Sequence, residues 1–220
     1  MKRTIMLLFL MGLISILISC GDKPESQIET IPAIINLPAD LDNMLRDSAI
    51  ITIYSDNKIV SQAKLGEIKD NRNFFVLNLS SGEHLIEVFI TGPNENVIYM
   101  LDRKPVNLIP EVKNSVDIQL GPPIKFDTKV INLSLNQEIK ITARVETSKL
   151  KDDIKNPEIH WTIDNIEGGN EEIGKITASG NTAILKGPAT LPSSNDHYLG
   201  AYFELENKKY VSIVKINYIE

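Results

Sequence analysis

Short runs in which apolar and polar side chains alternate constrain this chain more than any other sequence feature. Every second residue is apolar from Ile139 to Val145, and the same alternation runs from Val116 to Leu120. A period of two is typical of a β-strand with one face on a core and the other in water. Such runs recur along the chain between turn residues. They predict an all-β fold of antiparallel sheets packed as sandwiches.

Strands are expected throughout the chain, and helix is expected in one place only. A single helical turn is predicted at residues 40–46, where three apolar residues follow a proline at helical spacing. The predicted strands are 31–37, 49–55, 58–65, 73–79, 83–91, 97–102 and 112–120 in the first half, and 129–133, 138–147, 158–163, 174–177, 181–186, 197–205 and 209–219 in the second.

The sequence Gly121-Pro122-Pro123 interrupts the strand pattern near the middle of the chain. Proline fixes φ and has no N–H to donate to a β-ladder, so this tripeptide predicts a short, stiff boundary. It divides the chain into predicted domains at 32–121 and 122–220. Each is of a size that can fold as a single domain.

The N-terminus has the features of a lipoprotein signal peptide. Lys2 and Arg3 precede an almost wholly apolar run at 5–18, which is shorter than the roughly 20 residues that span a bilayer as a helix. The run ends in Leu-Ile-Ser-Cys at 17–20, which resembles the lipobox of bacterial lipoproteins. That resemblance implies cleavage after residue 19 and lipid on Cys20, the only cysteine of the chain. The alternative is an ordinary secretory signal with a coincidental cysteine.

The remaining chain is expected to reach a membrane through its lipid alone. Removal of Lys2 and Arg3 with the signal leaves 21 basic against 29 acidic residues, a formal charge of −8. Such a chain has no electrostatic attraction to nucleic acid or to anionic headgroups. Residues 20–31 are then the lipidated cysteine and a tether. The predicted location is the bacterial cell envelope, at the outer membrane or cell surface.

The segment 159–180 holds the only tryptophan and most of the turn glycines of the second half. Ile159, Trp161 and Ile163 alternate with polar residues, which predicts that all three point into the core. The segment resembles the bacterial Ig-like repeats of adhesins and cell-surface proteins over about 90 residues, except at 181–187, which depart from the repeat pattern. That resemblance implies an Ig-like sandwich with turn residues at Gly168, Gly169, Asn170, Gly174 and Gly180.

The first half carries a related resemblance. The stretch LNLSSGEHLIEVFITGPNENVIYMLDRKPVNL, residues 77–108, is similar to the prealbumin-like or Ig-like modules of bacterial surface proteins. This resemblance implies a β-sandwich in the first half as well, before the boundary at residues 121–123. Two tandem Ig-like antiparallel sandwiches after a signal and tether are therefore expected.

Residues that carry chemistry form no catalytic pattern in the sequence. A phosphate loop at Gly168-Gly169 is disfavoured, because Glu171 and Glu172 follow and no helix does. The same two carboxylates could instead belong to a calcium loop, but their spacing is not that of an EF-hand. The three histidines, which lie at positions 84, 160 and 197, are far apart in sequence and are expected in surface or turn roles. No cofactor and no metal are expected.

Function is predicted only by class. The favoured hypothesis is a non-enzymatic lipoprotein that displays Ig-like binding or structural modules to an unidentified protein or glycan partner. The alternative is an accessory subunit of an envelope complex that handles glycans or secretion. An enzyme is disfavoured, because no nucleophile, base or metal-ligand pattern accompanies the strands.

Overall fold

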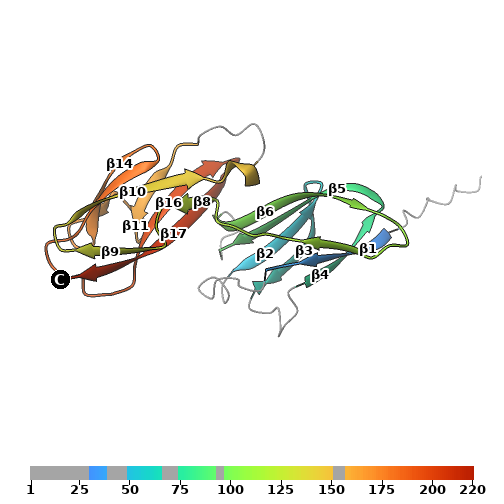
Figure 1. Cartoon of the computed structure of the whole chain (residues 1–220), viewed down its shortest axis with the longest axis horizontal. Helices are drawn as coiled ribbons and strands as arrows, with labels where there is room; N and C mark the ends of the chain where they lie inside the picture. The colour runs from blue at the N-terminus through green and yellow to red at the C-terminus, as the bar shows by residue number, and fades with distance from the viewer. Residues whose placement is uncertain (1–29, 39–48, 66–73, 93–96, 151–156) are drawn as a thin grey trace, which may run out of the picture.

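The computed structural model describes residues 30–38, 49–65, 74–92, 97–150 and 157–220. These residues form two β-sandwich modules placed end to end, with β1 toward one end of the long axis and the C-terminus at the other (Figure 1). The all-β prediction is confirmed. The predicted helical turn at 40–46, Cys20 and most of the predicted tether lie outside the described residues.

The N-terminal module contains the first seven strands. They are β1 (Thr30–Asn36), β2 (Ile50–Ser55), β3 (Lys58–Lys64), β4 (Phe74–Ser80), β5 (Gly82–Thr91), β6 (Val97–Leu108) and β7 (Asn114–Asp117). One sheet has the order β4-β1-β7, and the facing sheet has the order β6-β5-β2-β3. Inward residues of both sheets form one core, which includes Ala33, Ile51, Ile86 and Leu77.

The C-terminal module contains the remaining strands and a short 3-10 helix. They are β8 (Ile124–Phe126), β9 (Val130–Ser134), β10 (Glu138–Val145), η2 (Thr147–Lys149), β11 (His160–Ile163), β12 (Ile166–Glu167), β13 (Gly169–Asn170), β14 (Gly174–Ser179), β15 (Thr182–Lys186), β16 (His197–Leu205) and β17 (Lys208–Ile219). One sheet has the order β13-β14-β15-β10-β8. The other has the order β12-β11-β16-β17, with β9 also paired to β17.

Strand β6 links the two modules. Val97 and Ile98 pair in parallel with Lys209 and Tyr210 of β17, so the larger sheet of one module is hydrogen-bonded to that of the other. Ile98 lies in the C-terminal core, whereas Leu108, at the other end of the strand, lies in the N-terminal core. The domain limits at 121 and 122 remain a prediction, and β6 contributes residues to both cores.

Two strand predictions differ from the structure near the prolines. β6 was expected to end at residue 102 but continues through Pro105 to Leu108. β17 pairs with β6 only at Val97 and Ile98, the first two residues of β6. At Pro105, β6 therefore has β5 as a neighbour on one side only, and such an edge position tolerates the missing N–H of proline. Gly121, expected to be part of a short, stiff boundary between strands, exchanges backbone hydrogen bonds with Leu101, and Ile124 begins strand β8, which was not predicted.

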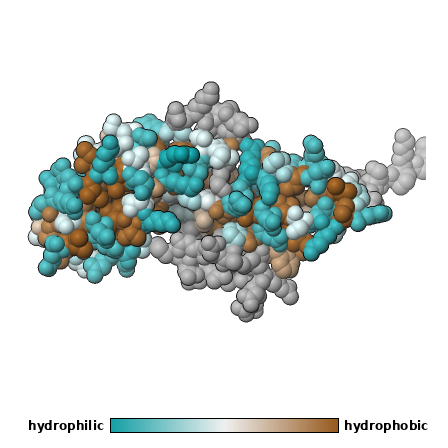
Figure 2. All heavy atoms as spheres, viewed as in Figure 1, coloured by the Kyte–Doolittle hydropathy of each residue, from teal (hydrophilic) through white to brown (hydrophobic). Residues whose placement is uncertain are grey.

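Apolar and polar side chains are interspersed on the surface of both modules, in keeping with the alternation in the sequence. Figure 2 shows hydrophobic residues reaching the surface between hydrophilic ones on this face of the molecule. Within the described ranges, no helix has the length and apolar character needed to cross a bilayer.

Candidate functional site

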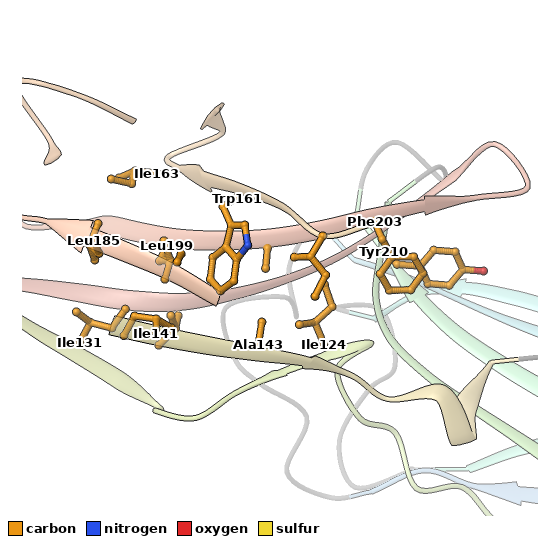
Figure 3. Packing of buried hydrophobic residues seen from close by; sticks show 14 of the residues in the cluster. Ile124, Ile131, Ile141, Ala143, Trp161, Ile163, Leu185, Leu199, Phe203 and Tyr210 are labelled. Carbon is orange, nitrogen blue, oxygen red and sulfur yellow. The ribbon is translucent and has the colours of Figure 1, made fainter. Parts of the chain in front are cut away.

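The tryptophan that dominates the sequence of the second half is a core residue. Trp161 is 2 % exposed, and Ile159 and Ile163 are buried beside it. Its indole Nε1 donates a hydrogen bond to the carbonyl oxygen of Gly180 at 3.1 Å, and its ring lies 6.1 Å from that of Phe126. Figure 3 shows the indole among aliphatic side chains of the C-terminal core. Because it is enclosed, this side chain has no surface to offer a partner.

The glycines after the tryptophan form a tight corner. Gly169 has φ +68°, and a Cβ there would lie 2.3 Å from the carbonyl oxygen of Gly174 and 2.8 Å from Cδ1 of Ile163. Both contacts are too close for any side chain. Gly168 and Gly180 also have positive φ. The backbone therefore requires glycine at residue 169 for steric reasons, and these residues shape a corner that no helix follows.

Asn170 and Glu171 of the same corner make local contacts. Asn170 accepts hydrogen bonds through Oδ1 from the backbone N–H groups of Glu172 (2.9 Å) and Ile173 (3.1 Å). Glu171 forms an ion pair with Lys175, whose hydrogen bond lowers the pKa of the Glu171 carboxyl. Over the part of the chain that the structure describes, no three histidine, cysteine, aspartate or glutamate side chains gather as a metal site.

The expectation that the histidines have surface or turn roles is wrong as to the surface for two of them, although both of these contact hairpin turns. His160 is half-buried and stacks on Tyr202, with ring centroids 4.9 Å apart. His84 and His197 have side chains only 9 % and 8 % exposed. The polar residues next to His84 and His197 in the sequence predicted exposed side chains. Each of these two histidines is instead enclosed and pairs with an aspartate from a neighbouring hairpin.

The two enclosed histidines make the same contacts, one in each module. Nδ1 of His84 lies 2.7 Å from Oδ2 of Asp56, whose Oδ1 accepts from the backbone N–H of Leu85 at 2.9 Å. Nε2 of His84 lies 2.9 Å from the carbonyl oxygen of Ser80. Asp56 and Asn57 form the β2–β3 turn, both with positive φ. We name this arrangement the His–Asp clasp. The hydrogen bond from Leu85 is the main cause of the lowered pKa of Asp56.

The C-terminal module repeats the clasp at the equivalent place. Nδ1 of His197 lies 2.5 Å from Oδ2 of Asp164, and Oδ1 of Asp164 accepts from the backbone N–H of Tyr198 at 2.8 Å. Nε2 of His197 lies 3.0 Å from the carbonyl oxygen of Ser194. Asp164 and Asn165 form the β11–β12 turn, again both with positive φ. In each module the clasp ties a hairpin turn to the start of the adjacent long strand, which indicates a structural role.

The candidate binding site is a trough on the outer face of β11, β16 and β17. We call it the tyrosine trough and define it by Tyr99, Tyr198, Gly200, Tyr202, Lys209 and Ile213, which line a hollow of about 410 Å³ together with Thr162 and charged residues at the rim. This volume lies within the roughly 300–1,000 Å³ that small-molecule sites occupy.

Alternation along β16 places the trough residues. Leu199, Ala201 and Phe203 are buried in the core, so Tyr198, Gly200 and Tyr202 point outward. Across the sheet, Gly200 is paired with Thr162 on one side and Ile213 on the other. Because glycine has no side chain, the hydroxyl group of Thr162 lies over Gly200, 2.5 Å from where a Cβ would be, and forms the floor between the two tyrosines.

The ring of Tyr202 is fixed in position. His160 stacks on it, and Nζ of Lys209 lies 3.6 Å from its centroid. Burial, with smaller contributions from Glu167 and Glu204, raises the pKa of the Tyr202 phenol. This wall of the trough is therefore organised before any ligand arrives.

Part of the trough could be recognised from the sequence. Tyr198 and Tyr202 occur at spacing i, i+4 in a strand whose intervening odd positions are apolar, so the pattern alone places them on the outer face. Tyr99 had no such signal, since it joins this face only because β6 lies beside β17.

Comparisons with known proteins identify no relative by sequence, since no protein-family model and no curated protein matches this chain. Solved structures do match. The titin M3 domain is 15 % identical and covers 44 % of this chain and 97 % of its own, with a TM-score of 0.30.

Two multidomain structures match over more of this chain. The titin Ig tandem domains A164-A165 are 9 % identical and cover 87 % of this chain and 97 % of their own, with a TM-score of 0.30. Extracellular domains 3-5 of Drosophila OTK are 16 % identical and cover 86 % of this chain and 60 % of their own, with a TM-score of 0.28. At these identities and TM-scores, no binding partner or activity passes from them to this chain.

Proposed function

We propose that this chain is a non-enzymatic lipoprotein that displays two Ig-like modules as binding or structural elements at the bacterial cell envelope. Cys20 carries the lipid, and the chain before Thr30 is long enough to span at most about 35 Å from that cysteine. The protein has a net negative charge, which gives it no attraction to anionic headgroups. Its attachment to the membrane therefore depends on the lipid.

The end-to-end placement of the two modules carries this proposal. β1, the first described strand after Cys20, belongs to the N-terminal module, and the C-terminal module extends away from it along the long axis (Figure 1). A protein anchored at Cys20 therefore presents the C-terminal module, and the tyrosine trough on it, on the side away from its anchor.

The ionisable side chains that lie deepest in the described residues serve the fold. Glu87 pairs with Arg103 at 3.1 Å, and Glu146 pairs with Lys125 at 2.9 Å. The two His–Asp clasps hold hairpin turns in place. These charged groups are thus paired within the fold, as in a binding or structural protein.

Replacement of Cys20 tests the anchor. Cys20→Ser is expected to lose incorporation of labelled palmitate and to leave the membrane fraction, with both modules folded. Ser19→Ala is the matched control, because it keeps a small residue before an intact cysteine and should stay with membranes. Sedimentation of Cys20→Ser with carbonate-washed membranes, in the same amount as the control, would refute the anchor.

One observation favours the second candidate function, an accessory subunit of an envelope complex. Phe74 and Val76 on the outer face of β4 are 42 % and 56 % exposed, and Ile34 of β1 lies opposite Val76. Exposed apolar side chains in one patch are typical of contacts between proteins. Mild crosslinking in cells tests this candidate. A stoichiometric envelope partner that is lost in Val76→Lys, but retained in Ile213→Lys on the other module, would favour it.

A further inference from the structure

The joint between the two modules contains side chains that complete a shared core. Ile98 and Leu101 of β6 are each 1 % exposed and belong to the core of the C-terminal module, although β6 pairs along most of its length with β5 of the N-terminal module. Phe89 of β5 packs against the same core. The C-terminal core is therefore closed at this end by residues of the N-terminal module.

Backbone hydrogen bonds hold the same joint at two places. Residues 97–98 of β6 pair in parallel with residues 209–210 of β17. Farther along β6, Leu101 exchanges two backbone hydrogen bonds with Gly121, at 3.0 and 3.2 Å, and Gly121 directly precedes the C-terminal module. A change in the distance between the modules would have to break these bonds, and a buried backbone group that loses its partner is costly.

The tip of the β16–β17 hairpin lies on an aromatic pair of the N-terminal module. Tyr54 of β2 and Phe89 of β5 meet edge to face, with their ring centroids 5.5 Å apart. Nζ of Lys208, which directly follows the hairpin turn, lies 5.4 Å and 5.3 Å from the two centroids. An ammonium group within about 6 Å of an aromatic centroid is attracted by the ring. One cation of the C-terminal module thus contacts two rings of the other module.

Tyr210, two residues beyond Lys208, connects the hairpin tip to both modules. Its ring stacks on Phe203 in the C-terminal core, with centroids 4.9 Å apart. Together with Glu87 of the N-terminal module it lines a hollow of about 200 Å³ between the modules. Burial is the main cause that raises the pKa of Tyr210 to about 12, and Glu87 adds to it. The start of β17 is therefore held firmly, which fixes the backbone from which Lys208 extends.

We propose that the contact of the hairpin tip, which we name the tip latch and define by Lys208, Tyr54 and Phe89, fixes the angle between the two modules. Relative motion is the default for two domains of one chain unless their interface is large and apolar. Here the shared core and the backbone hydrogen bonds set the distance between the modules, and the tip latch prevents them from tilting. The inference goes beyond the function proposed above and does not depend on the anchor, because every group involved lies within the two modules.

Double electron–electron resonance between two nitroxide labels on the purified full-length chain in detergent tests the tip latch. Cys20→Ser removes the only native thiol, and Asn78→Cys with Ser179→Cys places one label on an exposed strand residue of each module. This labelled chain should give one narrow distance distribution. Lys208→Ala should broaden the distribution about twofold or more, because modules without the contact tilt against each other. Lys208→Arg should keep it narrow, since a guanidinium group also binds aromatic faces.

Lys215→Ala is the matched control, because Lys215 lies on the same strand and pairs with Asp196 of its own module, and it should leave the distribution narrow. Fluorescence of the buried Trp161 confirms that each variant is folded. The proposal is overturned if the labelled chain without a lysine substitution already gives a broad distribution, if Lys208→Ala stays as narrow as Lys215→Ala, or if Lys208→Arg is as broad as Lys208→Ala. Since the labels report only on the two modules, such a failure leaves the membrane fractionation of Cys20→Ser, and hence the proposed anchor, untouched.

Discussion

The His–Asp clasp of the C-terminal module should contribute several kcal/mol to its stability, which replacement of Asp164 measures. The carboxylate accepts two hydrogen bonds, from Tyr198 N–H at 2.8 Å and from the His197 ring at 2.5 Å. Hydrogen bonds to charged groups contribute about 1.5–3 kcal/mol each. Alanine at the positive φ of residue 164 adds about 1–2 kcal/mol of strain. Since the carboxylate is 29 % exposed and water can partly replace it, we expect Asp164→Ala to lose about 3–5 kcal/mol.

Two further variants separate the contribution of the hydrogen bonds from those of backbone strain and of a surface charge. Asp164→Asn tolerates the turn and keeps an acceptor for Tyr198 N–H, so it should lose only about 1–2 kcal/mol. Asp196→Ala is the control for the loss of a surface charge, because it removes a 75 % exposed partner of Lys215. Exposed ion pairs contribute less than about 1 kcal/mol, so this variant should lose no more than that.

Urea unfolding followed by tryptophan fluorescence is the assay. Trp161 is the only tryptophan of the chain and lies in the C-terminal core, so its signal reports on the module that carries the substitution. A loss in Asp164→Ala no greater than that in Asp196→Ala would refute the conclusion that the clasp stabilises this module.

Three further predictions concern the core and the titrating groups. Trp161→Ala should lose about 3–5 kcal/mol of unfolding free energy by circular dichroism, whereas Ile166→Ala, 44 % exposed, should lose less than about 1 kcal/mol. The folded pKa of Asp56 lies below its ordinary 3.8, chiefly because Leu85 N–H bonds to it. Its stabilisation is therefore present above pH 3.8 and lost as the pH falls through the lower folded value. Asp56→Asn should remove that part of the acid dependence of Tm, and an unchanged acid limb would contradict the assignment. Burial raises the pKa of Tyr210 and of Tyr218 to about 12. Stability from these phenols should thus be complete below about pH 10 and decline as the pH approaches 12, and phenolate absorbance that rises fully before unfolding would show them to be accessible.

The strands could be predicted from the sequence because their signal is local. Alternation over five or more residues identified β10 and β16 near their observed limits, since one wet and one buried face impose a period of two. β8, β12 and β13 were missed, because two or three residues carry no period. Their pairing is decided by the neighbouring strand instead, as Ile166–Glu167 shows by pairing with β11.

The candidate site could be predicted less well, because it depends on contacts between distant segments. The burial of His197 follows from Asp164, 33 residues away, and nothing in its own polar neighbourhood indicates it. Tyr99 lines the trough only through the pairing of β6 with β17. The corner glycines, by contrast, could be recognised from the sequence, since glycine adopts positive φ without the steric penalty that a side chain imposes.

The repeated His–Asp clasp shows how each module fixes one of its own turns. Each copy consists of an Asp-Asn turn, a histidine near the start of the adjacent long strand, and hydrogen bonds to the same two kinds of backbone group. All the groups of one clasp belong to one module. Each module therefore holds this hairpin turn in place without a contact from the other module.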